Sequence, residues 1–124
     1  MPYKAGDTFH YQHPWYSSTM HLCVVLCDEY GDPPCVIIAP VNTRVEQSEI
    51  TVLLSAGSHT CIDRESVVTF MHMTSVRTSE IDAAPHNIRP PLNPPILKRI
   101  IEGAIISDEA PKKYQEFLKK ISNL

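Results

Sequence analysis

Two apolar segments of strand length, 20–27 and 35–43, constrain the fold of this chain more than any other feature. Both are rich in β-branched residues, and the segment 28–34 between them holds glycine, two prolines and acidic residues, as a hairpin connection does. Apolar side chains occupy both the odd and the even positions of each segment. A strand with this pattern is covered on both faces, so we expect the pair to lie inside a small barrel or a stacked sheet.

The polar residues of these two segments lie at their ends. His21 opens the first segment, and Asn42 and Thr43 close the second. In an antiparallel hairpin the start of one strand lies beside the end of its partner. The sequence therefore predicts that His21 and Thr43 are neighbours at one rim of the sheet, and this rim is the first candidate site.

The composition is that of one ordinary globular domain. A chain of 124 residues is long enough for a single core, and the hydrophobic (43%) and charged (20%) fractions are typical of a folded protein. The net charge is −3 with the histidines neutral, whereas proteins that bind nucleic acid by bulk charge are basic. Any nucleic-acid contact is therefore expected to be a local patch, helped by some of the six histidines.

The sequence predicts a cytoplasmic protein with no membrane contact. No apolar run approaches the ~20 residues of a transmembrane helix, and the polar segment 1–7 lacks the apolar core of a signal peptide. We therefore expect the four cysteines to be reduced. None of them forms a C-x-x-C pair. Cys23 and Cys27 are expected to share a strand face, too far apart for one tetrahedral metal.

Short strands with tight connections are expected over most of the remaining chain. They are 8–11, 50–54, 66–73 and 76–78, with a turn or short helix at 79–82. The five prolines of 84–95 make that stretch an extended connector, neither a helix nor a central strand. Asn93 is placed to cap a following helix, and a second helix with a lysine-rich face ends near 122.

The predicted fold class is therefore mainly β with C-terminal helices, in a single domain that spans 1–124. The barrel covers about 5–82, the connector 84–95 and the helices about 96–122. The alternation of strand and helix that a parallel sheet requires is missing, which argues against a Rossmann-like fold.

The loop 12–19 is the second candidate for contacts with a partner. It carries the only tryptophan, Trp15, beside Tyr16 and three hydroxyl residues that include Ser17. Aromatic residues on loops are more often contact residues than aromatic residues in strands. The alternative is that Trp15 folds back and caps an open barrel end, because tryptophan is well buried on average.

The order of four motifs resembles that of the MazF/PemK-type toxins of bacterial toxin–antitoxin systems. Gly6-Asp7 opens a strand, Val24-Val25-Leu26 lies in the next, Ile38-Ala39-Pro40-Val41-Asn42-Thr43 ends another, and Ser66-Val67-Val68 begins a later one. C-terminal helices follow, and the resemblance covers about the first two-thirds of the chain. It implies a small SH3-like (MazF/PemK/CcdB-type) barrel, a homodimer, an antitoxin partner, and cleavage of single-stranded RNA without metal or other cofactor.

Two departures from the family pattern bear on the site. The family usually carries an arginine just before the apolar strand, within a Gly-Arg-Pro-like triplet, where this chain has Met20-His21. Many members also carry an arginine or aspartate on the late strand, where this chain has Phe70-Met71-His72. Thr43 matches the family. Two interpretations follow: a divergent endoribonuclease that uses histidine, or a catalytically inactive MazF/CcdB-like interaction module. The second has a precedent, because a protein of this fold poisons DNA gyrase through protein contact.

RNA cleavage through the 2′-hydroxyl needs a base for that proton, an acid for the leaving 5′-oxygen and positive charge at the phosphate. Histidine serves each role near neutral pH, because its reference pKa is ~6.5. His21 is the candidate base, acid or phosphate clamp, and Thr43 the candidate hydroxyl donor to the phosphate. Further residues are expected to bind the substrate, namely Arg64, His59 or His72 as a second charge, and Trp15, Tyr16 and Ser17 on the loop.

Structural roles are the alternatives for these residues. A histidine at a strand end is commonly just hydrogen-bonded to a neighbour, turn chemistry accounts for the segment around His59, and Arg64 is flanked by Asp63 and Glu65. Three histidines at one rim are able to bind zinc, although no H-x-x-x-H or H-E-x-x-H motif requires it. A serine hydrolase is a weaker alternative, because no G-x-S-x-G elbow is present.

Overall fold

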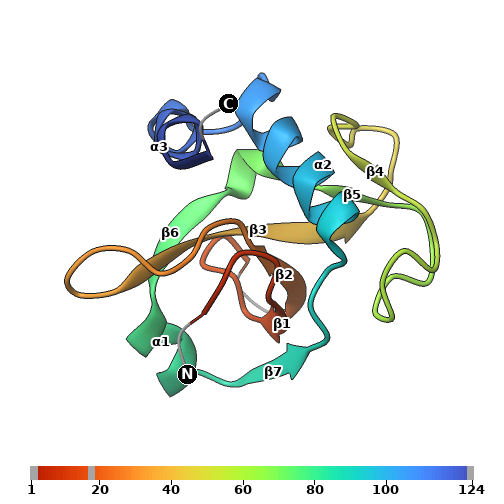
Figure 1. The fold of residues 1–124 in the computed structure, drawn as a ribbon. Coiled ribbons are helices and arrows are strands. Elements are labelled where there is room, and N and C mark those ends of the chain that lie inside the picture. Colours follow the sequence, from red (N-terminus) through yellow and green to blue (C-terminus); the bar gives the residue numbers. More distant parts are fainter. Residues whose placement is uncertain (1–2, 17–18, 123–124) are drawn as a thin grey trace.

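A computed structural model describes residues 3–16 and 19–122 and shows a small, mainly β domain with helices at its C-terminal end (Figure 1). The strands are β1 (Thr8–Tyr11), β2 (His21–Val25), β3 (Cys35–Thr43), β4 (Leu53–Leu54), β5 (Ser66–Val68), β6 (Thr74–Arg77) and β7 (His86–Arg89). The helices are the 3₁₀ helix η1 (Phe70–His72) and the α-helices α1 (Thr78–Ala83), α2 (Pro94–Ile106) and α3 (Lys112–Ser122).

Strand β3 is the centre of one antiparallel, seven-stranded sheet. The order is β4-β5-β3-β2-β1-β7, and β6 pairs with β3 outside this path. Because β3 is nine residues long, one of its edges pairs with β2 while the other pairs with β6 near its start and β5 near its end. In the described part of the chain, the outer strands β4 and β7 do not pair with each other, so the sheet is open.

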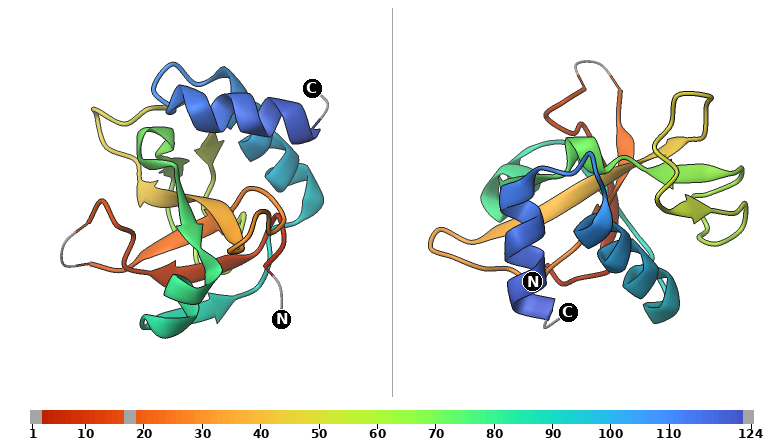
Figure 2. Two further views of the ribbon diagram at one scale, coloured as in Figure 1. Left: turned by 90° about the vertical axis from the view of Figure 1, so that its left-hand side faces the viewer. Right: turned by 90° about the horizontal axis from the view of Figure 1, so that it is seen from above.

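The prediction that β2 and β3 are covered on both faces is confirmed. Along β2, Leu22 and Val24 belong to one buried apolar cluster, whereas Cys23 and Val25 belong to another. Strand β3 divides its side chains between the same two clusters. Helices α2 and α3 pack on the first cluster and α1 on the second, and the views in Figures 1 and 2 place α1 away from the other two helices.

Helix α2 begins as the sequence predicts. The side chain of Asn93 accepts a hydrogen bond from the Ile96 N–H (3.0 Å), and Pro94 and Pro95 occupy the first turn, where a missing N–H is tolerated. Further along, the helix passes so close to the loop before β4 that a side-chain carbon added at Gly103 would overlap Val52. Only glycine permits this approach without a shift of the helix or the loop.

Several predicted elements differ from the observed ones, including the strand expected at 76–78, which is observed as β6 with Thr78 already in α1. The expected strand 66–73 ends at Val68 and continues as η1, which turns the fully buried Phe70 into the first cluster. The expected strand 50–54 is reduced to β4. Part of the proline-rich connector forms β7, an edge strand on β1, because its prolines flank residues 86–89 rather than interrupt them.

The expectation that Cys23 and Cys27 share a strand face is wrong. Strand β2 ends at Val25, so the two-residue alternation does not continue to Cys27. Cys23 lies in the cluster beneath α1, and Cys27 lies in the cluster beneath α2 and α3. All four cysteines are free thiols, and burial raises the pKa of Cys23 to about 12, so it packs as a small apolar side chain.

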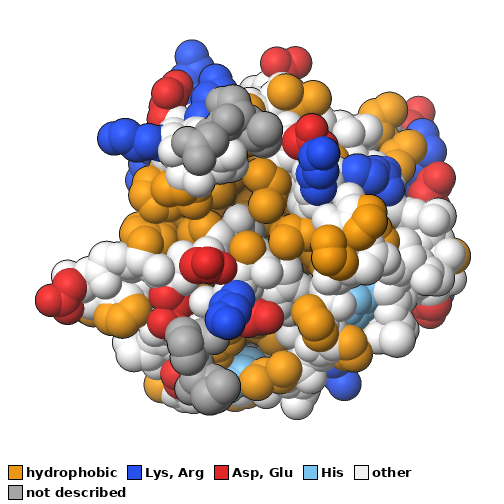
Figure 3. All heavy atoms as spheres, viewed as in Figure 1, with side chains coloured by type: hydrophobic (Ala, Val, Ile, Leu, Met, Phe, Trp, Pro, Cys, Tyr) orange, Lys and Arg blue, Asp and Glu red, His pale blue; other side chains and the backbone are white. Residues whose placement is uncertain are grey.

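The surface carries one broad hydrophobic area on the face seen in Figure 3, below the C-terminal helices. Between α2, α3 and the end of β2, a hollow of about 190 Å³ is lined by Leu26, Ile101, Leu118 and Ile121 among others. Among residues 3–16 and 19–122, none of the helices combines the length and the apolar character needed to span a membrane.

Candidate functional site

A pocket of about 600 Å³ lies at the rim of the sheet, where β2 begins and β3 ends. Parts of the loop that follows β3 and of the loop that precedes β5 form its remaining walls. Leu22 and Val41, which pair across the ladder, contribute apolar surface. The polar side chains of the pocket include His10, His21, Asn42, Thr43, Arg64 and Thr69.

His21 and Thr43 both line this pocket. The register pairs Leu22 with Val41, which places His21 opposite Asn42 and Thr43 one residue further along. Because side chains alternate between the faces of a strand, His21 and Thr43 leave opposite faces of the sheet. They share a pocket at the rim but form no hydrogen bond with each other, so any joint action would have to run through a bound molecule.

The His21 imidazole is held by an aromatic neighbour. Its ring stacks on Tyr16 with centroids 4.0 Å apart and an interplanar angle of 21°. Its Nδ1 is enclosed and has no hydrogen-bond partner in the described part of the chain. Because Nδ1 is buried, Nε2 is the ring nitrogen through which His21 can contact a ligand.

A cluster of aromatic and imidazole rings, His13, Trp15, Tyr16, His21 and His72, adjoins this end of the sheet; we call it the ring cluster. The Trp15 indole stacks on His72 with centroids 5.3 Å apart and an interplanar angle of 13°. Trp15 nevertheless keeps 62% of its surface exposed. It therefore does not close the sheet as a buried cap, and the outer face of the indole is open to a planar ligand.

Hydrogen bonds tie the ring cluster to the end of β3. The Asn42 amide Nδ2 donates to the Tyr16 hydroxyl (3.1 Å) and to Thr69 Oγ1 (2.7 Å). Tyr16 Oη lies 2.8 Å from His72 Nδ1. Because Tyr16 accepts from Asn42, its own proton is free to be donated to His72. The loop 12–16, β3 and η1 are thus joined at one corner.

Burial keeps two histidines of the ring cluster weakly basic. His13 is fully buried, and burial lowers its pKa to about 4. Its Nδ1 accepts the backbone N–H of Trp15 (3.1 Å). The pKa of His72 is also lowered, first by burial and then by the charge of His21. Protonation of these two rings below neutral pH is therefore opposed by their burial in the folded protein.

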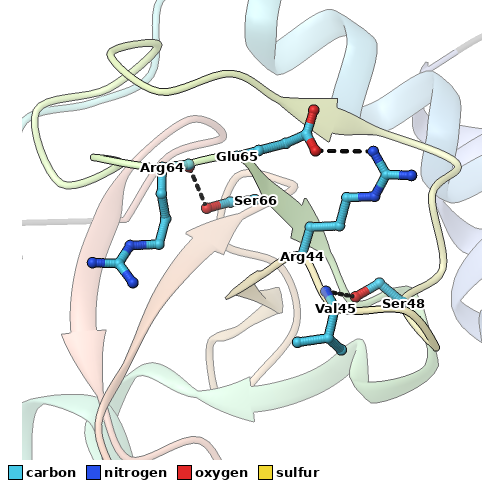
Figure 4. Close-up of polar contacts among 6 residues, drawn as sticks. All are labelled: Arg44, Val45, Ser48, Arg64, Glu65 and Ser66. Carbon is cyan, nitrogen blue, oxygen red and sulfur yellow. Dashed lines mark hydrogen bonds and ion pairs between the residues drawn. The ribbon is translucent and has the colours of Figure 1, made fainter.

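Arg64 is the most accessible cation on the pocket wall. Its Nε lies 3.3 Å from Asp63, and both side chains are highly exposed; such pairs contribute little stability. Arg44, by contrast, donates to Glu65 at 2.9 Å. Figure 4 shows the Arg64 guanidinium directed away from the Arg44–Glu65 pair, with the Arg64 carbonyl accepting from Ser66 Oγ. Arg64 is thus free to exchange its weak partner for an anion.

The structure places His59, a predicted substrate-binding residue, within the fold. It is buried, and it is not among the residues that line the pocket. Its Nδ1 accepts the Cys61 N–H (3.0 Å), so its ring proton is on Nε2 and is donated to the Pro90 carbonyl (2.6 Å). Both nitrogens are used, and the imidazole fastens the loop before β5 to the segment after β7.

The outcome for the predicted site residues is thus mixed. The structure gathers Trp15, Tyr16, His21 and His72 in the ring cluster and places Thr43 and Arg64 on the pocket wall beside His21. Ser17 lies outside the described residues. Sequence reasoning missed His10, which lines the pocket from β1; its alternation with buried Phe9 and Tyr11 showed a polar strand face but not what that face adjoins.

Among the residues that the structure describes, no group of three or more histidine, cysteine, aspartate or glutamate side chains is arranged to hold a metal ion. Comparison of the chain with models of known protein families and with curated proteins found no match.

Proposed function

We propose that this chain is a divergent MazF/PemK-like toxin, an endoribonuclease that cleaves single-stranded RNA without a metal ion. The proposal includes an SH3-like barrel, a homodimer, and an antitoxin as protein partner. A cytoplasmic location belongs with these functions, because the RNA substrate is found there. The order of the four sequence motifs supports the family assignment.

The observation that carries the proposal is the content of the rim pocket. An imidazole, a hydroxyl and an accessible guanidinium, those of His21, Thr43 and Arg64, line one pocket of about 600 Å³. Trp15, 62% exposed, lies in the adjoining ring cluster. Single-stranded nucleic acid is bound by just this combination of stacking surfaces for bases and positive groups for phosphates.

The chemistry follows from the groups present. The 2′-oxygen of the substrate attacks the adjacent phosphorus while its proton passes to a base, and the bond from phosphorus to the 5′-oxygen breaks as that oxygen takes up a proton. The products are a 2′,3′-cyclic phosphate and a 5′-hydroxyl. His21, acting through Nε2, transfers one of these protons, while Thr43 donates to a phosphate oxygen and Arg64 offsets the developing negative charge.

Binding without cleavage is the second candidate function, and one observation favours it. His21 and Thr43 leave opposite faces of the sheet, and Tyr16 covers one face of the His21 ring. A pocket arranged in this way holds a strand of nucleic acid or a protein segment equally well without bringing both groups to one phosphate. The pocket is then an interaction site and not a catalytic one.

Digestion of a mixed-sequence RNA in the presence of EDTA separates the two functions. Cleavage that persists in EDTA and falls by about 10²–10⁴-fold in His21→Ala fits a general acid or base. The matched control is His86→Ala at the start of β7, outside the pocket residues, which retains activity. Thr43→Val, which keeps the side-chain shape, is expected to be impaired as well. RNA that stays intact with the unaltered chain contradicts the enzyme and leaves the binding function.

A further inference from the structure

His10 and Arg89 are two basic side chains that meet where β1 pairs with the edge strand β7. His10 lines the pocket from β1, and Arg89 lies on the neighbouring edge strand β7. Arg89 Nε donates a hydrogen bond to His10 Nδ1 over 2.9 Å. In the ladder Arg89 is opposite Thr8, two residues from His10, so the His10 and Arg89 side chains leave the same face of the sheet.

This hydrogen bond decides which atoms the pair presents to a ligand. Because His10 Nδ1 accepts, the ring proton is on Nε2. Nε2 has no hydrogen-bond partner within residues 3–16 and 19–122 and is not one of the enclosed polar atoms. The terminal amino groups of the exposed Arg89 are also without a partner there. The pair therefore offers N–H donors and no acceptor, from His10 on the pocket wall and from Arg89 beside it. Arg89 itself lines a neighbouring pocket of about 410 Å³ that also holds Asp7 and Asp82.

The groups that surround His10 are basic, as expected for a site that binds an anion. Burial lowers the pKa of His10 most, and the charges of Arg89, His59 and His21 lower it further. All three of these neighbours are basic, and no carboxylate contributes. A site that holds one guanidinium and unpaired N–H donors is complementary to an anion, and a guanidinium binds phosphate oxygens through two parallel hydrogen bonds.

We infer that His10 and Arg89 form a phosphate-binding pair that holds a backbone phosphate of single-stranded RNA at the pocket. This inference rests on the proposed function for the identity of its ligand. Arg89 has two tasks: it contacts the phosphate through its terminal amino groups, and through Nε it keeps the His10 proton on Nε2. Phosphate oxygens are the shared chemistry, and their source is either a nucleic-acid backbone or free inorganic phosphate.

Binding of a strand that cannot be cleaved tests the pair apart from catalysis. The probe is a mixed-sequence, all-2′-deoxy single strand with a fluorescent label, and the affinity is measured by anisotropy at several salt concentrations. Arg89→Gln is expected to weaken binding at least fivefold and to reduce the salt dependence by about one phosphate contact. The matched control is Arg77→Gln, which removes the same charge from β6. Arg77 pairs with Cys35 at the start of β3, whereas the pocket lies at the end of β3. This variant is expected to change the affinity less than about twofold.

Substitutions of His10 separate the donor from the ring. His10→Gln places an amide N–H near the position of Nε2 and is expected to retain most of the affinity. His10→Leu has no donor and is expected to lose about as much as Arg89→Gln. Circular dichroism of each variant shows whether it is folded.

Nuclear magnetic resonance of the unaltered protein provides a readout that needs no variant. The ¹⁵N shifts of the His10 ring report whether Nε2 carries the proton. Inorganic phosphate alone is expected to shift the Arg89 Nε–H and the His10 ring signals, whereas chloride at equal ionic strength is not. Absence of a phosphate effect, together with equal affinities of Arg89→Gln and Arg77→Gln for the strand, overturns the inference.

The outcomes also separate this inference from the proposed function. Cleavage that depends on His21 but is indifferent to Arg89 and His10 upholds the nuclease and overturns the phosphate pair. A phosphate response at Arg89 and His10 in a protein that binds no nucleic acid upholds an anion site for free phosphate and overturns its assignment to RNA.

Discussion

The middle of the β2–β3 pair and its outer end are built from the same two strands but have opposite surroundings. In the middle, Leu22 to Val25 alternate between two apolar clusters, and helices cover both faces. At the end, His21, Asn42 and Thr43 meet a pocket and the ring cluster. Strands whose middle is packed on both faces cannot slip in register without repacking both apolar clusters, so the polar residues at their ends are held at fixed positions.

The largest expected effect in this comparison is on stability and comes from the packed middle. Ile37 on β3 is fully buried in the cluster beneath α2 and α3. Ile37→Ala is expected to lower the free energy of unfolding by about 2–5 kcal/mol, through lost burial and the cavity left behind. Urea titration measures it.

If the middle only supports the rim, the folded fraction of Ile37→Ala binds the labelled deoxy strand with unchanged affinity. A loss of affinity that persists under conditions where the variant is fully folded would show that packing and binding are not separable in this way.

The next effect concerns His13, which belongs to the ring cluster but is buried like the core. The unfolded chain takes up a proton at His13 near pH 6.5, whereas the folded chain does so only near pH 4. The unfolded state therefore binds more protons between these values, and stability falls as the pH decreases through this window. By pH 5 the loss is about 2 kcal/mol.

The His13 prediction has a direct and an indirect measurement. The proton resonances of the His13 ring should titrate with a midpoint near 4, and a midpoint near the ordinary value would refute the prediction. His13→Asn keeps an acceptor for the Trp15 N–H and cannot titrate. Urea unfolding at pH 7.5 and pH 5 should show a smaller acid loss for this variant than for the unaltered protein.

A comparable effect, on binding and not on stability, is expected at the exposed end of the ring cluster. Trp15→Ala removes the open indole face and is expected to weaken binding of the deoxy strand by about 1–3 kcal/mol, the range for one stacked base. The control is Ile106→Ala on α2, which removes a similarly exposed apolar side chain. Equal affinities for both variants would mean that Trp15 stacks on no base.

The smallest effect is at the cap of a helix that covers the packed middle. Asn93→Ala leaves the Ile96 N–H without its acceptor and is expected to cost about 1 kcal/mol of stability. Asn93→Ser restores an N-cap oxygen and should recover most of that loss in the same urea titration. Binding of the deoxy strand should be unaffected by both variants, and an effect on it would extend the site beyond the rim and the ring cluster.

Much of the fold could be predicted from local patterns. The two-sided apolar character of β2 and β3, the cap at Asn93 and the two C-terminal helices are written in spacing and in residue type, and each is observed. The predictions failed where a strand-like sequence pattern extends beyond the residues that pair with a neighbouring strand. Phe70 has a residue type suited to a strand, yet β5 pairs with β3 only as far as Val68, and the chain then turns to bury Phe70.

The candidate site was predictable in part. The rim was found because antiparallel pairing joins the start of β2 to the end of β3, and Trp15 and Tyr16 stood out on their loop. His10 and His59 could not be told apart in the same way. Each is a histidine in a polar segment. His10 Nε2 makes no hydrogen bond within the described residues, whereas both ring nitrogens of His59 are hydrogen-bonded to backbone groups.

The sequence by itself determined which strands are buried on both faces, where helix α2 begins, and which rim carries polar groups, because these depend on the alternation and capping of neighbouring residues. Only the tertiary structure decided that Tyr16 covers His21, that His21 and Thr43 are offset by one position, and that Arg89 lies against His10. These contacts join residues 5 to 79 positions apart. They are set by strand register and by the packing of distant segments, which no local pattern specifies.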